Sequence, residues 1–186
     1  THRLNPIFHG TLEGRPPNES TTVRTMGRSA AMLEQLRRVG IINVKDVCIT
    51  PAGCAGFHAV VSIKKSYHGH VRETMFAVLG HPTLFCKQVI VVDEDIDPWN
   101  AFKVEWAMAT RVQAGRDVVI IPGGKSLTLD TSQVLSRRGE SDQMGIDATT
   151  PHEYYAKDGG RFPDNAEPLP ADLAKVRARW KEYGID

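Results

Sequence analysis

The amino-acid sequence predicts an α/β domain with a mainly parallel sheet built from βαβ units and helices on both faces, followed by an irregular segment and a C-terminal helix. Two observations support this fold class. Aliphatic runs at residues 88–92 (QVIVV) and 118–121 (VVII) are typical of strands that are covered on both faces. Segments of helical periodicity lie around them, and strands that alternate with helices form βαβ units.

The first expected elements are a connecting segment, a helix and two strands. Residues 1–22 contain Asn-Pro and Pro-Pro breakers, which predict an irregular connection. Residues 21–38 have a moderate helical pattern that ends before Gly40. Residues 44–49 and 57–63 are short apolar runs, and the second (FHAVVSI) is rich in β-branched residues, as buried strands are.

A helix, a strand and a second helix follow. Apolar residues recur at i, i+4, i+7 and i+8 within residues 69–79, which predicts a helix with one buried face. The aliphatic strand at residues 88–92 comes next. Asp97 is expected to cap a helix that has Pro98 at its first position and continues to about Arg111.

From residue 122 to about 170 the periodicity is lost, and Gly, Pro, Ser and Asp dominate. A structureless stretch of this length is unusual inside one domain, so we expect it to line a site or to wrap over a neighbour. The chain then ends in a helix with an apolar stripe that stops at Gly184. The stripe consists of Leu169, Leu173, Val176, Trp180 and Tyr183. It needs a partner surface, which is either its own domain or another subunit of an oligomer.

Composition and charge exclude several classes of protein. The 186 residues are 41% hydrophobic and 24% charged, with a net charge of +1, a balance typical of globular proteins and not of a nucleic-acid surface. No apolar run approaches the roughly 20 residues of a membrane span. Three cysteines without a recognisable signal peptide indicate a reducing, cytoplasmic location. Because the sequence begins at Thr1 and not at Met, we expect a piece of a longer protein.

Two clusters suggest ligands but have simpler explanations. The acidic run at residues 93–97 (DEDID) follows an aliphatic strand, where open α/β sheets bind ligands, and could hold Mg²⁺. Acidic residues near a helix start are also stabilised by the helix dipole. Residues 122–126 (PGGKS) resemble the end of a phosphate-binding loop, but Val119 replaces its first glycine. These clusters define an alternative, a free-standing Mg²⁺- or nucleotide-binding α/β domain.

The other polar side chains form no complete site in the sequence. Cys54, His58, His68 and His70 have the spacing of no standard zinc set. Residues 64–70 form a basic loop that could meet a phosphate or be a solvated turn. We find no nucleophile–base pair, no acid–base pair and no metal set. The residues alone therefore assign neither a catalytic residue nor a metal ligand to this chain.

Four sequence blocks occur in one order at consistent separations. They are THRLNPIFHGTLEGRPPNE (1–19), ITPAGCAGFHAVVSIKKSYHGHVRETMFAVLG (49–80), VIVVDEDIDPWNAFKVEWAMATRV (89–112) and MGIDAT (144–149). Together they resemble the C-terminal third of UbiD-like decarboxylases, which include the 3-octaprenyl-4-hydroxybenzoate carboxy-lyases and the ferulic acid decarboxylases. The resemblance covers nearly the whole chain and is weakest at residues 20–45 and 123–143.

The resemblance implies an enzyme with an N-terminal α/β part, a central split β-barrel that holds prenylated FMN, and a C-terminal α/β domain that mediates oligomerisation and closes over the cofactor. In the family, the flavin acts as an electron sink while carbon dioxide leaves an aromatic or α,β-unsaturated acid, and the reaction is reversible. The catalytic residues, a divalent metal (Mn²⁺ or Mg²⁺) and potassium are expected mainly in the part upstream of residue 1. No catalytic residue is therefore expected in this chain.

Two positions match family residues that approach the site. Leu129 matches a hydrophobic residue that lines the substrate pocket. His81 stands where ferulic acid decarboxylases place a lysine near the flavin, and a neutral histidine does not replace a fixed ammonium charge. The match gives the irregular stretch after residue 122 a role, which is to cover the substrate side of the flavin.

The expected domains are a connecting segment at residues 1–22, a C-terminal α/β domain at 23–150, and a tail at 151–186 whose helix packs on its own domain or contacts another subunit. The expected partners are the N-terminal flavin-binding portion, further copies of the chain (a dimer or higher oligomer) and the acid substrate, without nucleic acid or a membrane span. The isolated chain is expected to be inactive. A second alternative is a non-catalytic accessory subunit that only binds the larger piece.

Overall fold

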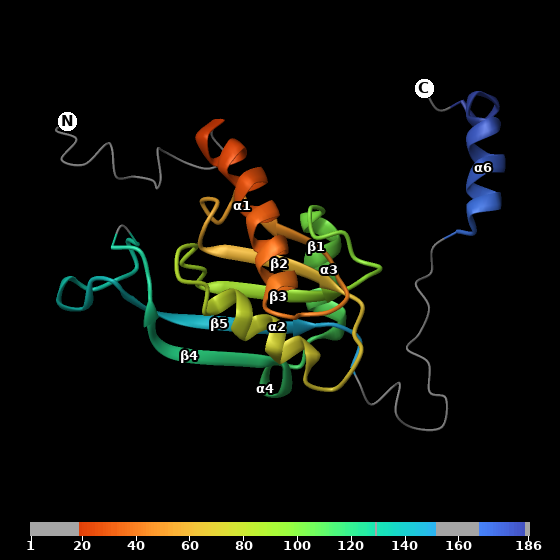
Figure 1. Ribbon diagram of the computed structural model, residues 1–186. Coiled ribbons are helices and arrows are strands. Elements are labelled where there is room, and N and C mark those ends of the chain that lie inside the picture. Colours follow the sequence, from red (N-terminus) through yellow and green to blue (C-terminus); the bar gives the residue numbers. More distant parts are fainter. Residues whose placement is uncertain (1–18, 129, 152–167, 185–186) are drawn as a thin grey trace. The chain divides into compact units, whose positions relative to one another are not determined.

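Five strands form one sheet, as the computed structural model of the chain shows (Figure 1). They are β1 (Val44–Ile49), β2 (His58–Ile63), β3 (Gln88–Asp93), β4 (Val118–Lys125) and β5 (Glu140–Ala148). The order across the sheet is β1-β2-β3-β5-β4. The central strands β2, β3 and β5 are parallel, whereas the edge strands β1 and β4 run antiparallel to their neighbours. The α/β prediction is confirmed, with a parallel centre and antiparallel edges.

The structure describes residues 19–128, 130–151 and 168–184. The chain divides into two units, Thr1–Pro151 and His152–Asp186, and each is described by itself. The sheet and all elements up to β5 belong to the first unit. No helix within the described ranges has both the length and the apolar character needed to cross a membrane.

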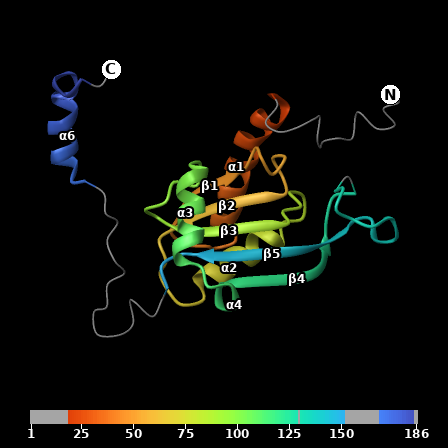
Figure 2. The same ribbon diagram turned by 180° about the vertical axis from the view of Figure 1, so that it is seen from behind.

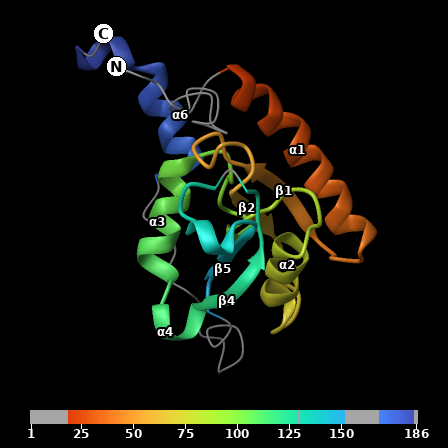
Figure 3. The same ribbon diagram turned by 90° about the vertical axis from the view of Figure 1, so that its left-hand side faces the viewer.

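Helices cover both faces of the sheet, as the sequence predicts. α1 (Glu19–Arg38) and α2 (His70–Leu79) lie on one face. α3 (Ala101–Arg111) and the short α4 (Ala114–Asp117) lie on the opposite face, which Figures 2 and 3 show from behind and from the side. The sheet is therefore the middle layer of a three-layer unit.

Two apolar cores, one on each face, explain why the central strands β2 and β3 are mostly aliphatic. Successive side chains of a strand point to opposite faces, so β2 and β3 each supply both cores, whereas the buried apolar residues of β5 belong to the core under α3. The core under α1 and α2 includes Met32, Leu36, Val71, Met75, Val61, Val89 and Val91. The core under α3 includes Val104, Ala107, Val60, Ile90 and Val92. Each fully buried side chain of this size stabilises the fold by about 1.5–3 kcal/mol.

Two helix starts differ from the prediction. α1 begins at Glu19, inside the segment expected to be a connection. The prediction that Asp97 caps α3 is wrong, because Asn100 does so and accepts a hydrogen bond from the backbone N–H of Lys103 at 3.2 Å. The Asp97 carboxylate instead accepts a hydrogen bond from the backbone N–H of Trp99 in the preceding turn.

The stretch expected to be irregular contains a central strand. β4 continues through the Pro-Gly-Gly segment to Lys125, with a register shift between Ile121 and Gly124. β5 then returns between β3 and β4. Residues 126–139, called the β4–β5 loop below, connect the two strands at one edge of the sheet.

The described part of the second unit is a helix followed by a short 3₁₀ helix. They are α6 (Pro170–Ala178) and the segment Trp180–Tyr183. All its described residues are exposed, including the predicted apolar stripe. These residues form no core among themselves, so both alternatives for the partner surface of the stripe remain predictions.

Candidate functional site

The candidate site lies at the edge of the sheet where the three parallel strands begin. The segments that lead into β2, β3 and β5 come together at this edge, because parallel strands start on the same side of a sheet. These segments are residues 50–57, residues 80–87 and the β4–β5 loop. Both positions that the family resemblance singles out belong to them by sequence, His81 to the second and Leu129 to the third.

Lys87 is held in the middle of this edge by its backbone. The backbone N–H groups of Lys87 and Gln88 donate to the carbonyl oxygen of Phe57 at 2.8 and 2.9 Å. On the other side, the carbonyl of Lys87 accepts from the N–H of Met144 at 2.7 Å. Lys87 is thus fixed between the start of β2 and β5, and its side chain extends toward the β4–β5 loop.

Asp130 is the centre of a buried polar network in that loop. The Lys87 Nζ lies 2.7 Å from Asp130 Oδ2, and the two side chains are 20% and 5% exposed. The Lys87 Nζ also donates to the Ser132 Oγ at 2.7 Å, and Ser132 donates through its hydroxyl and its backbone N–H to Asp130 Oδ1. Ser141 of β5 donates to Asp130 Oδ2 at 3.2 Å. Both carboxylate oxygens are therefore satisfied.

The network fixes the charge of Asp130. Burial alone would raise the pKa of this carboxyl group, but hydrogen bonds from Lys87 and Ser132, together with the Lys87 charge, outweigh it and hold the pKa below its ordinary value. Asp130 therefore stays ionised near neutral pH and is unsuited to act as a proton donor there. The pair acts as a structural charge pair in this state.

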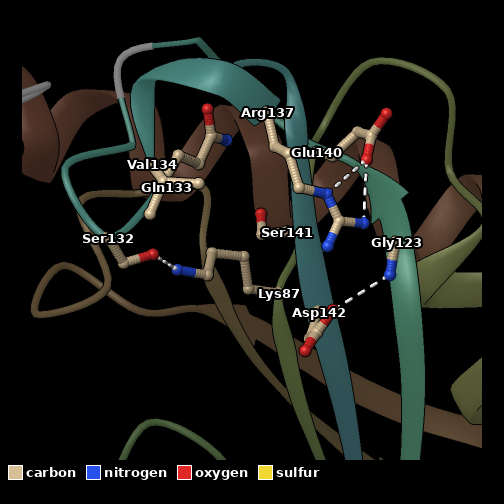
Figure 4. A pocket seen from close by; sticks show the side chains of 9 residues that line it. All are labelled: Lys87, Gly123, Ser132, Gln133, Val134, Arg137, Glu140, Ser141 and Asp142. Atoms are coloured by element: carbon tan, nitrogen blue, oxygen red, sulfur yellow. Dashed lines mark hydrogen bonds and ion pairs between the residues drawn. The ribbon is translucent and has the colours of Figure 1, made fainter.

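The β4–β5 loop is also tied together internally and borders a cavity of about 370 Å³. The Gln133 amide donates to the carbonyl of Leu127 at 2.9 Å and accepts from the N–H of Gly139 at 2.8 Å. The N–H of Ser126 donates to the carbonyl of Gly139 at 2.8 Å, which closes the loop at its base. Figure 4 shows the lining residues, which are Lys87, Gly123, Ser132, Gln133, Val134, Arg137, Glu140, Ser141 and Asp142.

His81 lies at the same edge, directly after α2. Its Nδ1 accepts a hydrogen bond from the backbone N–H of Thr83 at 3.3 Å, so the neutral ring carries its proton on Nε2. Burial lowers the pKa of His81, which favours the neutral form. The ammonium group of Lys87 at this edge is paired with Asp130. The flavin contact of His81 stays a prediction.

Leu129, the predicted substrate-pocket residue, lies outside the described residues. Its sequence neighbours Thr128 and Asp130 are described, and Asp130 carries the network given above. The role of Leu129 as a pocket residue also stays a prediction.

The acidic run at the opposite edge of the sheet is an ion-pair network. Arg111 at the end of α3 donates to Asp93 at 3.0 Å and to Asp95 at 2.7 Å, and its side chain is 2% exposed. Asp93 also accepts from the backbone N–H and the hydroxyl of Thr150, which follows β5. These contacts join α3 and the residues that follow β5 to β3. They also occupy the carboxylates of Asp93 and Asp95, which a Mg²⁺ site in the acidic run would need.

The other ligand motifs of the sequence are not brought together as sites. The Gly123-Gly124-Lys125 segment is part of strand β4 and does not precede a helix, as a phosphate-binding loop would. Among the described residues, no three His, Cys, Asp or Glu side chains are grouped to hold a metal ion. The basic loop is engaged too, because Lys65 donates to the carbonyl of Thr150 and Lys64 lies 3.9 Å from Glu94. Among the described residues, these motifs therefore form no site that fits a flavin phosphate or its metal.

Sequence reasoning did not identify Lys87, Asp130, Ser132 and Ser141. The four residues come from three separate segments, and none of them forms a motif. One local signal is that Lys87 directly precedes an aliphatic strand, a position that parallel sheets place at an edge. Asp130 and Ser132 form a short Asp-x-Ser turn, in which an aspartate commonly accepts from the residue two positions on.

Fold and site together define a class of protein: an α/β domain whose β4–β5 loop is anchored by a buried polar network and which has, in its described residues, no complete catalytic set. Residues 21–148 match the family described as 3-octaprenyl-4-hydroxybenzoate carboxy-lyase C-terminal domain. The chain belongs to this family, the UbiD-class decarboxylases, and corresponds to their C-terminal domain.

Three similar proteins illustrate the relationship. The anhydromevalonate phosphate decarboxylase of Methanocaldococcus jannaschii is 39% identical over 145 residues, which are 77% of this chain and 33% of the relative. The UbiD-class enzyme HmfF of Pelotomaculum thermopropionicum, solved in complex with FMN, is 38% identical with a TM-score of 0.73, over 84% of this chain and 34% of that one. The closed form of the vanillic acid decarboxylase of Sedimentibacter hydroxybenzoicus is 30% identical with a TM-score of 0.75, over 90% and 34% of the two chains. The chain thus spans about a third of the length of the curated relatives it matches.

Proposed function

We propose that this domain works in a reversible, non-oxidative decarboxylase that acts on an aromatic or α,β-unsaturated carboxylic acid through prenylated FMN. The observation that carries the proposal is the family match over residues 21–148, joined to 38% identity with an enzyme solved with FMN. A form of the same enzyme has been solved with prenylated FMN. When bound, this cofactor supplies the electron sink that decarboxylation needs.

The direct tasks of this domain would be to close over the site and to help form an oligomer. The hydrogen-bonded β4–β5 loop with its cavity supports the first task, because such a wall can exclude water from the reacting groups. The apolar stripe of the second unit supports the second task, because its side chains are exposed in the described part of the chain. The partners would be an N-terminal flavin-binding portion and further copies of the chain, as a dimer or higher oligomer.

The catalytic residues, the divalent metal (Mn²⁺ or Mg²⁺) and potassium would belong to the flavin-binding portion. The engaged carboxylates and lysines of the described residues support this assignment. The free thiols of Cys48, Cys54 and Cys86 are consistent with a cytoplasmic enzyme, which we propose as its setting.

The proposal is tested with the full-length protein, purified from a host that makes prenylated FMN. The assay measures carbon dioxide release from 3,4-dihydroxybenzoate, vanillate and anhydromevalonate phosphate, the acids named for its relatives. Exchange of labelled bicarbonate into the substrate tests reversibility. Release of carbon dioxide only from the flavin-loaded protein supports the proposal. A flavin-loaded protein that leaves every acid of a broader aromatic and unsaturated panel intact contradicts it.

The 186-residue chain by itself separates this proposal from its alternatives. We expect it to carry no flavin absorbance and to release no carbon dioxide. Retained flavin or unaided turnover would refute the assignment of the active site to another portion. An accessory subunit would instead restore activity when it is added to a separately expressed flavin-binding protein. A rise in melting temperature with Mg²⁺ and ATP would favour the nucleotide-binding alternative.

A further inference from the structure

The ion pair between Lys87 and Asp130 has a geometry that suits positioning. The Lys87 backbone is fixed on both sides, by Phe57 at the start of β2 and by Met144 of β5. Its side chain is largely buried and ends 2.7 Å from Asp130. The Lys87 end of the ion pair is therefore anchored in the sheet.

The other end of the pair controls the β4–β5 loop. The Asp130 carboxylate accepts hydrogen bonds from the hydroxyl and the backbone N–H of Ser132 and from the hydroxyl of Ser141. It therefore joins the loop to β5 as well as to β3. Gln133 and the Ser126–Gly139 bond tie the two sides of the loop to each other. The described residues of the loop are thus connected to the sheet through the buried carboxylate of Asp130.

We propose that the Lys87–Asp130 pair is a positioning device that fixes the β4–β5 loop as a rigid wall on the substrate side of the active site. The inference rests on the proposed function. It names the residues that would position the substrate. Because the sheet already holds the loop in place, the loop would not have to become ordered when the substrate binds. Preset geometry lowers the entropy lost on binding and keeps reacting groups aligned.

A stabilising role alone explains this arrangement less well. Two charges removed from water lose hydration, and well-packed apolar side chains of similar volume often stabilise a fold as much or more. The pair differs from an apolar contact in its directionality, because four donor groups of Lys87, Ser132 and Ser141 meet Asp130 along fixed lines. This directionality sets where the loop lies.

The test uses the flavin-loaded full-length protein with substitutions that remove one part of the pair. In Lys87→Met the ammonium group is lost while most of the side-chain volume remains, and in Asp130→Asn the charge is lost while the shape remains. Lys87→Arg retains a cation and serves as the conservative variant. Lys45→Met is the matched control, because it removes an exposed lysine that lies 3.2 Å from Glu94, away from this loop.

We expect Lys87→Met and Asp130→Asn to raise KM about tenfold, with kcat within about threefold of the unaltered enzyme, because the wall is displaced while the chemistry remains. Lys87→Arg should recover part of the loss, and Lys45→Met should leave both constants unchanged. Hydrogen exchange gives an independent readout. The backbone N–H groups of Ser132 and Gly139 should exchange at least about tenfold faster in Lys87→Met, because their acceptors are no longer held.

The outcomes separate this inference from the proposed function. An unchanged KM in Lys87→Met, measured below the melting temperature of every variant, would leave the pair with a stabilising role only and overturn the inference. A raised KM without faster exchange at Ser132 and Gly139 would also overturn it, since the loop would not have moved. Absence of decarboxylation in the unaltered, flavin-loaded protein would instead overturn the proposed function, and with it the substrate-side meaning of the wall.

Discussion

His70 is a buried histidine whose two ring nitrogens are both used. It is fully buried in the first turn of α2, and the Tyr67 ring stacks on it with 4.8 Å between the two ring centroids. Its Nδ1 accepts from the backbone N–H of Ser66 at 3.2 Å, so the proton is on Nε2, which donates to the carbonyl of Ile42 at 2.9 Å. A second proton on Nδ1 would face the N–H of Ser66. Burial accordingly lowers the pKa of His70.

The lowered pKa predicts that stability falls in mild acid. The folded state binds the proton more weakly than the unfolded chain, whose histidine pKa is about 6.5. The contribution of His70 to the free energy of unfolding is therefore complete above that pH. It decreases as the pH falls below the unfolded-state pKa and through the folded-state pKa. Burial lowers the pKa of His58 and His81 as well, so their contributions have the same sign. Urea unfolding between pH 7.5 and 5.5 measures this slope.

The contribution of His70 is isolated with His70→Gln, whose amide can neither gain nor lose a proton in this range. We expect lower stability than the unaltered chain at pH 7.5 and a shallower decrease toward pH 5.5. An equally steep decrease in His70→Gln would show that the pH dependence arises elsewhere.

The same residue shows what the sequence can and cannot reveal at this scale. The sequence predicts that His70 stands at the start of a helix, and this is confirmed. Its partner Ile42 lies 28 positions earlier and becomes a neighbour only when the sheet forms. Lys87 and Asp130 were missed for the same reason, because neither side chain belongs to a motif until the β4–β5 loop folds against β3.

At the scale of elements, β5 is the strand that sequence reasoning missed. Its residues, ESDQMGIDA, contain charged, amide and glycine positions and only three aliphatic or sulfur side chains. Several of the polar groups are satisfied in place, as Gln143 shows by donating to the carbonyls of Leu79 and Cys86 at 3.2 Å. Hydrophobic periodicity does not detect a strand of this kind. The strands β1, β2 and β3 were predicted because most of their residues are apolar and buried.

Gly145 of β5 sets the distance between this strand and α2. A Cβ atom at this position would lie 2.8 Å from the Sδ and 3.1 Å from the Cγ of Met75. Met75 is 1% exposed and packed in the first core, so it can retreat only by disturbing its neighbours. We predict that Gly145→Ala lowers the free energy of unfolding by about 1–3 kcal/mol through overpacking. Chemical denaturation at constant pH measures the loss.

Gly27 of α1 provides the matched control, because a Cβ there meets nothing within 4 Å. Gly27→Ala should raise the free energy of unfolding by about 0.5–1 kcal/mol, since alanine restricts the unfolded helix segment and costs no contact. The same substitution is thus expected to have opposite signs on two elements. A neutral or stabilising Gly145→Ala would mean that Met75 adapts without cost and that α2 is not held at this distance.

At the scale of the whole chain, the two units differ in what supports them. Both apolar cores are built from residues between Met32 and Ala148 of the first unit. The described residues of the second unit are all exposed, and its stripe carries two large aromatic side chains, Trp180 and Tyr183. The first unit therefore has the means to fold without the second, whereas the stripe requires a surface that α6 does not supply.

This difference predicts the result of ending the chain after Pro151. We expect the shortened chain to unfold cooperatively with a melting temperature within about 4 °C of the full one, because a loss below about 1 kcal/mol shifts it by no more than that in a domain of this size. We also expect it to lose the self-association of the full chain, since the aromatic stripe is the surface proposed to bind another copy. Calorimetry and light scattering after size exclusion measure the two effects. A large drop in melting temperature with no change in mass per particle would show that the stripe packs on its own sheet, and the oligomer role of α6 would then be wrong.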